Sequence, residues 1–201
     1  MYEFRGEGWQ VSAHTHGQML LALYVRDLAG IEHPGSPEIA PLAPVVKPHA
    51  AGEVSGYRAA ELRQEWQDWW HRILHQDPAV DGMFSPPGFP YFADSPTLQR
   101  ILRAHYGSAL SWSRERQAEY TQVSSEHHAS GRRRLLEEMI IERALELDRA
   151  PRTMHLKMVE LPLAQRRAWF VDPDTVILSQ DLPRDAELYR SFLEPVIRFL
   201  L

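Results

Sequence analysis

The 201-residue sequence contains no cysteine and no asparagine, and only two of its twenty-two basic residues are lysines. Without cysteine the chain can form no disulfide, bind no metal through thiolate and supply no thiol nucleophile. Because asparagine and lysine have AT-rich codons, the excess of arginine indicates a GC-rich gene and is not by itself a sign of phosphate binding.

Long apolar runs, a basic leader and a strong net charge are also missing. The apolar run Met19–Val25 is too short to span a membrane, and the N-terminal residues MYEFRGEG lack the basic start of a signal peptide. We therefore expect a cytoplasmic protein with no membrane partner. The formal net charge is -5, and the most basic part, residues 97–152, has ten bases against eight acids. This balance argues against nucleic acid as a partner.

What is present is an ordinary amount of core-forming material, with 44% hydrophobic and 24% charged residues. Helical spacing of the apolar residues, together with capping signals, predicts five helices. They cover about 15–30, 55–76, 95–112, 132–149 and 184–201, and residues 121–131 are the expected interruption. Dense prolines predict two loops, at 31–50 and 78–96.

After Pro151 the pattern changes to short runs of β-forming residues, RTMHLKMVELPL, AWFV and TVILS, which predict three strands. The sequence thus predicts one α+β domain over residues 1–201. Its mainly helical part, 1–152, packs with a small three-stranded antiparallel sheet and a terminal helix in 153–201.

The segment EWQDWWHRILHQ, residues 65–76, has two chemically different faces when placed on a helix. Trp66, Trp69 and Trp70 share the apolar face, which indicates core. Asp68, His71 and His75 lie opposite, one turn apart, and this spacing suits ligands of one divalent metal. A solvated helix face with an Asp–His hydrogen bond is the alternative interpretation.

Two more histidines, His14 and His16, flank the expected start of the first helix. The helix dipole disfavours imidazolium at that end, and neutral imidazole is the form that binds a metal. Either histidine is a candidate to complete the metal shell. Neutral histidine at a helix start without any metal is the alternative.

Residues Arg132, Arg133 and Arg134 follow His127-His128 at a predicted helix start, and they form a candidate anion-binding site. The alternative is a pair of exposed i, i+4 ion pairs, Arg133–Glu137 and Arg134–Glu138.

His105 and Arg116 project from the apolar stripe of the helix that begins near residue 95. If that stripe lines a cavity, partial burial would tune His105 as a general acid–base, with Arg116 beside it. Otherwise both are core residues that hydrogen bonds satisfy.

The second proline-rich loop carries four aromatic residues, Phe84, Phe89, Tyr91 and Phe92. Such a loop is too apolar to remain in water, so it forms either a partner-binding surface or an intramolecular wrap. Prolines pre-order a segment and reduce the entropy lost on docking.

The chain has no GxSxG, P-loop, complete GxGxxG or HExxH motif. The sequence therefore favours a non-catalytic protein that binds a protein partner or self-associates. The alternative is a metal-dependent hydrolase or related small-molecule enzyme that uses Asp68, His71 and His75, with a divalent metal as cofactor.

Overall fold

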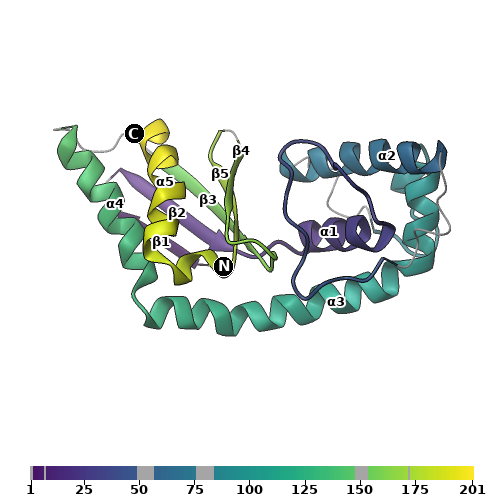
Figure 1. Ribbon diagram of the computed structural model, residues 1–201, viewed down its shortest axis with the longest axis horizontal. Helices are drawn as coiled ribbons and strands as arrows, with labels where there is room; N and C mark the ends of the chain where they lie inside the picture. The colour runs from purple at the N-terminus through teal and green to yellow at the C-terminus, as the bar shows by residue number, and fades with distance from the viewer. Residues whose placement is uncertain (1, 7, 49–56, 76–83, 148–153, 172) are drawn as a thin grey trace. The chain divides into compact units, whose positions relative to one another are not determined.

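The computed structural model describes residues 2–6, 8–48, 57–75, 84–147, 154–171 and 173–201 (Figure 1). The α+β prediction is confirmed, because the described residues form five α-helices and a five-stranded mixed sheet. Two compact units divide the chain: Met1–His16 with Gln117–Leu201, and Gly17–Arg116. None of the described helices combines the length and apolarity that a membrane crossing needs.

The first unit contains the sheet, whose strand order is β1-β2-β3-β5-β4. The strands are β1 Tyr2–Gly6, β2 Trp9–His14, β3 Met154–Leu161, β4 Ala168–Val171 and β5 Thr175–Ser179. Strands β2, β3 and β5 pair in parallel, while β1 and β4 are antiparallel edges.

The prediction of a three-stranded antiparallel sheet is therefore wrong, although its three strands exist. A meander would place β4 between β3 and β5. In the structure β3 pairs directly with β5 in parallel, and β4 lies at the edge, where its one partner among the described strands is β5. The missed strand β2 alternates buried Trp9, Val11 and Ala13 with partly buried residues, which is the period-two signal of a strand. Its partner β3 lies far along the chain, so no local pattern indicates the pairing.

The core of this unit lies on one face of the sheet, under helices α4 Arg132–Glu146 and α5 Ala186–Leu200 (Figure 1). From α5, Tyr189, Leu193 and Ile197 enter this core. The neighbouring apolar side chain of Phe199 remains 65% exposed. The helix thus has more apolar surface than its own core covers.

Helix α3 runs without a break from Pro96 to Ala129, so the predicted interruption over 121–131 is wrong for most of its length. Only Ser130 and Gly131 separate α3 from α4, and Gly131 adopts a φ of 71°. Polar residues at 121–128 weaken the apolar pattern, but none of them is a proline or glycine that would end a helix.

The second unit is helical, with α1 Gly17–Ala29, α2 Tyr57–Leu74 and the first part of α3. Gly30 ends α1 at a φ of 64°, and the Gly30 and Ile31 amides donate to Asp27 and Arg26 carbonyls, as in a Schellman motif. The start of α3 is held by Glu65 of α2, whose carboxylate accepts from the Thr97 and Leu98 amides.

The tryptophan face of α2 is core, as predicted. Trp66, Trp69 and Trp70 are only 1–3% exposed, and the indole of Trp66 donates to the Ala22 carbonyl at 2.7 Å. His71 and His75 lie on the exposed side.

Candidate functional site

A groove opens between α5 and the edge strand β4 and encloses about 500 Å³. We call it the aromatic groove. The residues that line it are all of apolar type and come from β4, β5 and α5: Ala168, Phe170, Val176, Phe192, Pro195, Val196 and Phe199. Phe170 and Phe199 are 37% and 65% exposed, and their rings meet edge to face at 5.4 Å between centroids. Exposed aromatic residues around a concave apolar surface are typical of a binding site.

Sheet register explains why Phe170 lies in this groove. Phe170 pairs with Val176 and Ala168 pairs with Leu178, and both partners belong to the core on the α5 side of the sheet. Residues directly opposite in a sheet point to the same face, so Ala168 and Phe170 also point to the α5 side. Since α5 extends over that side, its outer apolar residues and the two β4 residues form the walls.

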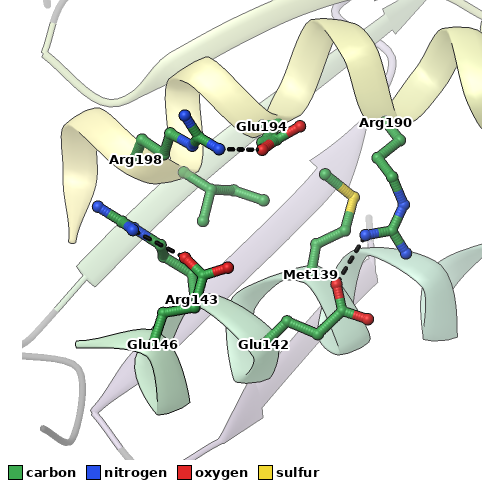
Figure 2. A pocket seen from close by; sticks show the side chains of 8 residues that line it. Met139, Glu142, Arg143, Glu146, Arg190, Glu194 and Arg198 are labelled. Atoms are coloured by element: carbon green, nitrogen blue, oxygen red, sulfur yellow. Dashed lines mark hydrogen bonds and ion pairs between the residues drawn. The ribbon is translucent and has the colours of Figure 1, made fainter. Parts of the chain in front are cut away.

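A smaller cavity, of about 40 Å³, lies between α4 and α5 (Figure 2), and we call it the ionic cavity. Its rim carries three ion pairs: Arg190 with Glu142 at 2.7 Å, Arg143 with Glu146 at 2.8 Å, and Arg198 with Glu194. Every arginine on the rim is therefore paired with a carboxylate. The cavity offers no spare positive charge for an anionic ligand. The Arg190–Glu142 pair joins α5 to α4, whereas the other two pairs lie within one helix each.

One buried pair of ionisable residues escaped the sequence analysis. His127 of α3 and Glu160 of β3 are 6% and 9% exposed, with Nδ1 and Oε2 3.4 Å apart. Within the described part of the chain, His127 Nε2 and Glu160 Oε2 have no hydrogen-bond partner. Glu160 continues the inward-facing series Met154, Leu156 and Met158 of β3, and this alternation was the signal that could have located it.

Burial and the Glu160 carboxylate change the pKa values of two other groups, Tyr189 and His14. Burial, with a further contribution from Glu160, raises the pKa of Tyr189. Burial also lowers the pKa of His14, against an opposing effect of Glu160. A His–Glu pair can transfer protons. However, neither His127 nor Glu160 lines the aromatic groove or the ionic cavity, so we assign the pair a structural role between α3 and the sheet.

The residues predicted as metal ligands are placed as the helical spacing requires. The ring centroids of His71 and His75 lie 4.1 Å apart, and the Asp68 carboxylate accepts a hydrogen bond from the Gln64 side-chain amide at 3.0 Å. His14 and His16, 6.0 Å apart between ring centroids, belong to the other unit. Over the described ranges, no three His, Asp or Glu residues are close enough together to hold a metal ion.

His105 and Arg116 lie on one side of α3 and are partly buried. Arg116 lies 5.4 Å from the ring centroid of Trp112 and 3.6 Å from the carboxylate of Glu115. Neither His105 nor Arg116 lines the aromatic groove or the ionic cavity. Their catalytic role stays a prediction.

Of the predicted anion-binding arginines, Arg134 lies in an exposed i, i+4 ion pair with Glu138 at 3.3 Å. This pair is one of the two that the alternative interpretation predicted. The side chains of Arg132 and Arg133 lie outside the described residues.

The aromatic residues predicted to bind a partner pack within their own unit. Phe89 and Phe92 are 1% and 2% exposed. Trp69 of α2 contacts the rings of Phe84 and Phe92, and Tyr91 also packs against Phe92. Intramolecular contacts therefore occupy most of the surface that the sequence offered to a partner.

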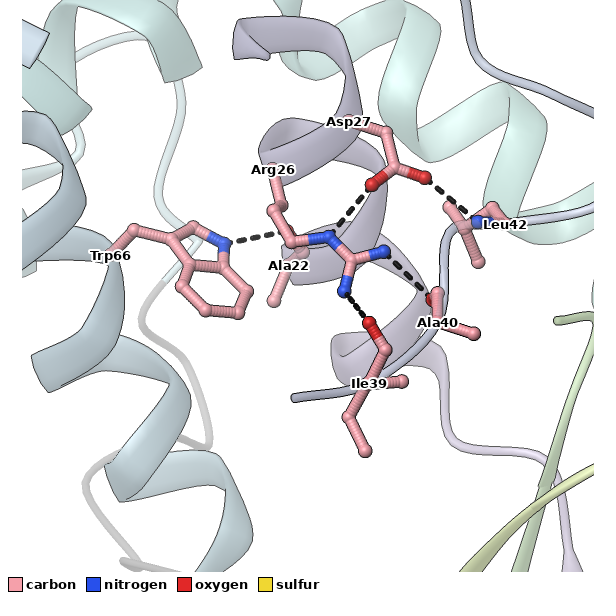
Figure 3. A network of polar contacts seen from close by, with 7 residues as sticks. All are labelled: Ala22, Arg26, Asp27, Ile39, Ala40, Leu42 and Trp66. Atoms are coloured by element: carbon pink, nitrogen blue, oxygen red, sulfur yellow. Dashed lines mark hydrogen bonds and ion pairs between the residues drawn. The ribbon is translucent and has the colours of Figure 1, made fainter. Parts of the chain in front are cut away.

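The first proline-rich loop is held in the same unit by a buried arginine (Figure 3). Arg26 of α1, 3% exposed, donates to the Ile39 and Ala40 carbonyls at 2.7 and 2.9 Å and to Asp27 at 2.7 Å. The other carboxylate oxygen of Asp27 accepts from the Leu42 amide at 2.8 Å. Ile39 and Leu42 are buried, so this loop is an intramolecular wrap over its described residues.

Comparisons with known proteins return no matching family model, curated protein or solved structure. Geometry and chemistry alone support the functional proposal, and the feature that supports it best is the aromatic groove.

Proposed function

We propose that this is a non-catalytic, cytoplasmic interaction protein that binds a protein through the aromatic groove. The observation that carries the proposal is Phe199, 65% exposed beside Phe170 on the rim of a groove lined by apolar residues. When a partner covers a phenylalanine that is so exposed, the removal of its apolar surface from water makes the free energy of binding more favourable. The proposed cytoplasmic location rests on the sequence, which contains no cysteine.

The groove also explains why α5 is apolar over so wide an arc. Tyr189, Leu193 and Ile197 already fill the core of the unit. Phe199 adds nothing to that core, yet it extends the apolar wall toward β4. Aromatic side chains are enriched at interfaces because they bury a large area with few rotatable bonds.

Site-specific photo-crosslinking tests the proposal. A benzophenone amino acid replaces Phe199 in the full chain, and Leu145, 75% exposed on α4, is the matched control position. We expect position 199 to crosslink to one defined protein segment, identified by mass spectrometry of the joined peptides. Phe170→Glu should abolish that crosslink, whereas position 145 should not give it. If position 199 yields only adducts within its own chain, the groove binds no protein and the proposal fails.

One observation favours a second candidate, the metal-dependent enzyme. His71 and His75 present neighbouring imidazoles on an exposed face, with Asp68 one turn before them. Elemental analysis of protein purified without a histidine tag should then find about one divalent metal per chain, lost in both His71→Ala and His75→Ala. Equal metal content in parent and variants rejects this candidate.

A further inference from the structure

Within the described part of the chain, strand β4 pairs along only one of its two edges. Among the described strands its neighbour is β5 alone, because β4 is the last strand of the sheet. The Ser179 amide donates to the Arg167 carbonyl at 3.0 Å, which identifies that position of the ladder as a hydrogen-bonded pair. Such pairs alternate along antiparallel strands, so Trp169 and Val171 also bond to β5. The N–H and C=O groups of Ala168 and Phe170 therefore point away from the sheet.

This edge lacks the features that usually prevent strand pairing. Sheet edges are commonly protected by a lysine, a proline, an inward charge or a bulge. The strand Ala-Trp-Phe-Val has no charged residue and no proline, and its register with β5 is unbroken. The unpaired edge is also a wall of the aromatic groove, since Ala168 and Phe170 line it.

We infer that the protein bound at the groove is a second copy of this chain, joined by antiparallel pairing of β4 with the partner's β4. This inference rests on the proposed function and names its partner. Isologous pairing about a two-fold axis brings the outward groups of Ala168 opposite those of Phe170 in the other copy, and the reverse. Trp169 of one chain then lies opposite Trp169 of the other chain. Each large Phe170 side chain meets a small Ala168 on the same face, and the two sheets become continuous.

Charge at the two ends of β4 favours the antiparallel direction. Arg166 and Arg167 precede the strand, and aspartates follow at positions 172 and 174. Antiparallel pairing brings the basic start of one strand next to the acidic end of the other, whereas parallel pairing would align like charges. Asp174 also lies 3.4 Å from Lys157 of its own chain, and Arg167 lies 5.8 Å from the ring centroid of Trp169, so Arg166 is the residue at which we test the contribution of charge.

Interface size sets the expected affinity. The pairing involves four residues of each β4, plus the exposed surfaces of Phe170 and Phe199. This falls at the small end of stable protein interfaces. We therefore expect a reversible dimer with a dissociation constant on the order of 10 µM.

The first experiment measures mass in solution by light scattering and sedimentation, from about 1 to about 100 µM. The parent should approach twice the 23.2 kDa of one chain as the concentration rises. Ala168→Pro removes an outward N–H that β5 does not use, at the first residue of the strand, where proline is tolerated. We expect this variant to weaken the dimer at least about tenfold while keeping the parent's circular dichroism.

Arg166→Glu supplies an independent test that leaves the backbone unchanged, and Arg114→Glu is its matched control. Both arginines are exposed, but Arg114 lies on α3 in the other unit. Arg166→Glu should raise the dissociation constant roughly tenfold, and the control should leave it within about twofold of the parent.

The outcomes separate this inference from the proposed function. A parent that stays monomeric up to about 100 µM overturns pairing through β4. A dimer that survives in a folded Ala168→Pro variant, or that responds equally to Arg114→Glu, also overturns it. In each case crosslinking from position 199 decides the proposed function separately. A joined peptide from a different protein keeps the groove as a binding site. Adducts confined to one chain reject both the groove as a binding site and the pairing through β4.

Discussion

Replacing Arg26 with leucine should detach the first proline-rich loop from α1. In the folded protein the Arg26 guanidinium has two carbonyl partners in the loop, at Ile39 and Ala40, and lies 2.7 Å from Asp27. Leucine fills much of the space but leaves both carbonyls without this donor. It also leaves the Asp27 carboxylate, 11% exposed, without its positive neighbour.

The size of the effect follows from these lost partners. Removing one member of a buried ion pair typically costs about 3–5 kcal/mol, because the other charge stays buried without compensation. Each carbonyl that loses a charged donor adds to the cost, and relaxation of the loop toward water offsets part of it. We expect Arg26→Leu to lower the free energy of unfolding by about 3–5 kcal/mol, a large share of the stability of a typical domain.

Urea denaturation followed by tryptophan fluorescence measures the loss, and hydrogen exchange at the Leu42 amide locates it. That amide donates to Asp27, so detachment of the loop should expose it to exchange. Arg26→Lys is the control: it keeps the charge but cannot reproduce the forked contacts of the guanidinium, and we expect a smaller loss of about 1–3 kcal/mol. A loss below about 1 kcal/mol in Arg26→Leu, with unchanged Leu42 exchange, would refute the reasoning.

Three further predictions concern other polar groups that are wholly or partly buried. Glu65→Ala removes the carboxylate that accepts from two backbone amides at the start of α3, and it should cost about 1 kcal/mol in urea denaturation, whereas an unchanged midpoint contradicts this role. His127→Ala removes a buried side chain that lies 3.4 Å from the Glu160 carboxylate, itself 9% exposed. We expect a loss of about 2 kcal/mol in urea denaturation from the carboxylate left without this neighbour and from the cavity, and a change under about 1 kcal/mol would show that the contact contributes little. Because burial lowers the pKa of His14 below 6.5, the unfolded chain binds a proton there more readily than the folded chain. Stability should therefore fall as the pH drops below about 6.5, by less than about 1.4 kcal/mol per pH unit from this site. His14→Gln should flatten that slope and the exposed His155→Gln should not; equal slopes would assign the effect to other groups.

Some features of this protein were determined by the sequence itself. The 3.6-residue spacing of Trp66, Trp69 and Ile73 separated the core face of α2 from its histidine face, and the structure confirms both. The sequence also predicted that the first helix ends at Gly30, because glycine adopts a positive φ readily, and α1 does end there with Gly30 at a positive φ. These are properties of one element and its neighbours along the chain, so a local pattern suffices to reveal them.

Other features were decided only by tertiary structure. Strand β2 pairs in parallel with β3, far along the chain, and this pairing converted a predicted three-stranded sheet into a five-stranded mixed one. The same sheet brought Glu160 against His127 of α3, two residues that no sequence spacing relates.

The candidate site shows the difference most clearly. Phe199 and Phe89 are both phenylalanines in apolar parts of the sequence, and the sequence alone does not say which of them stays exposed. Phe89 is buried by aromatic contacts within its unit, whereas Phe199 extends beyond the core that Leu193 and Ile197 complete. Periodicity establishes which residues share a face of one element. Whether that face is covered depends on the other elements that the fold brings against it, and that information is distributed over the whole chain.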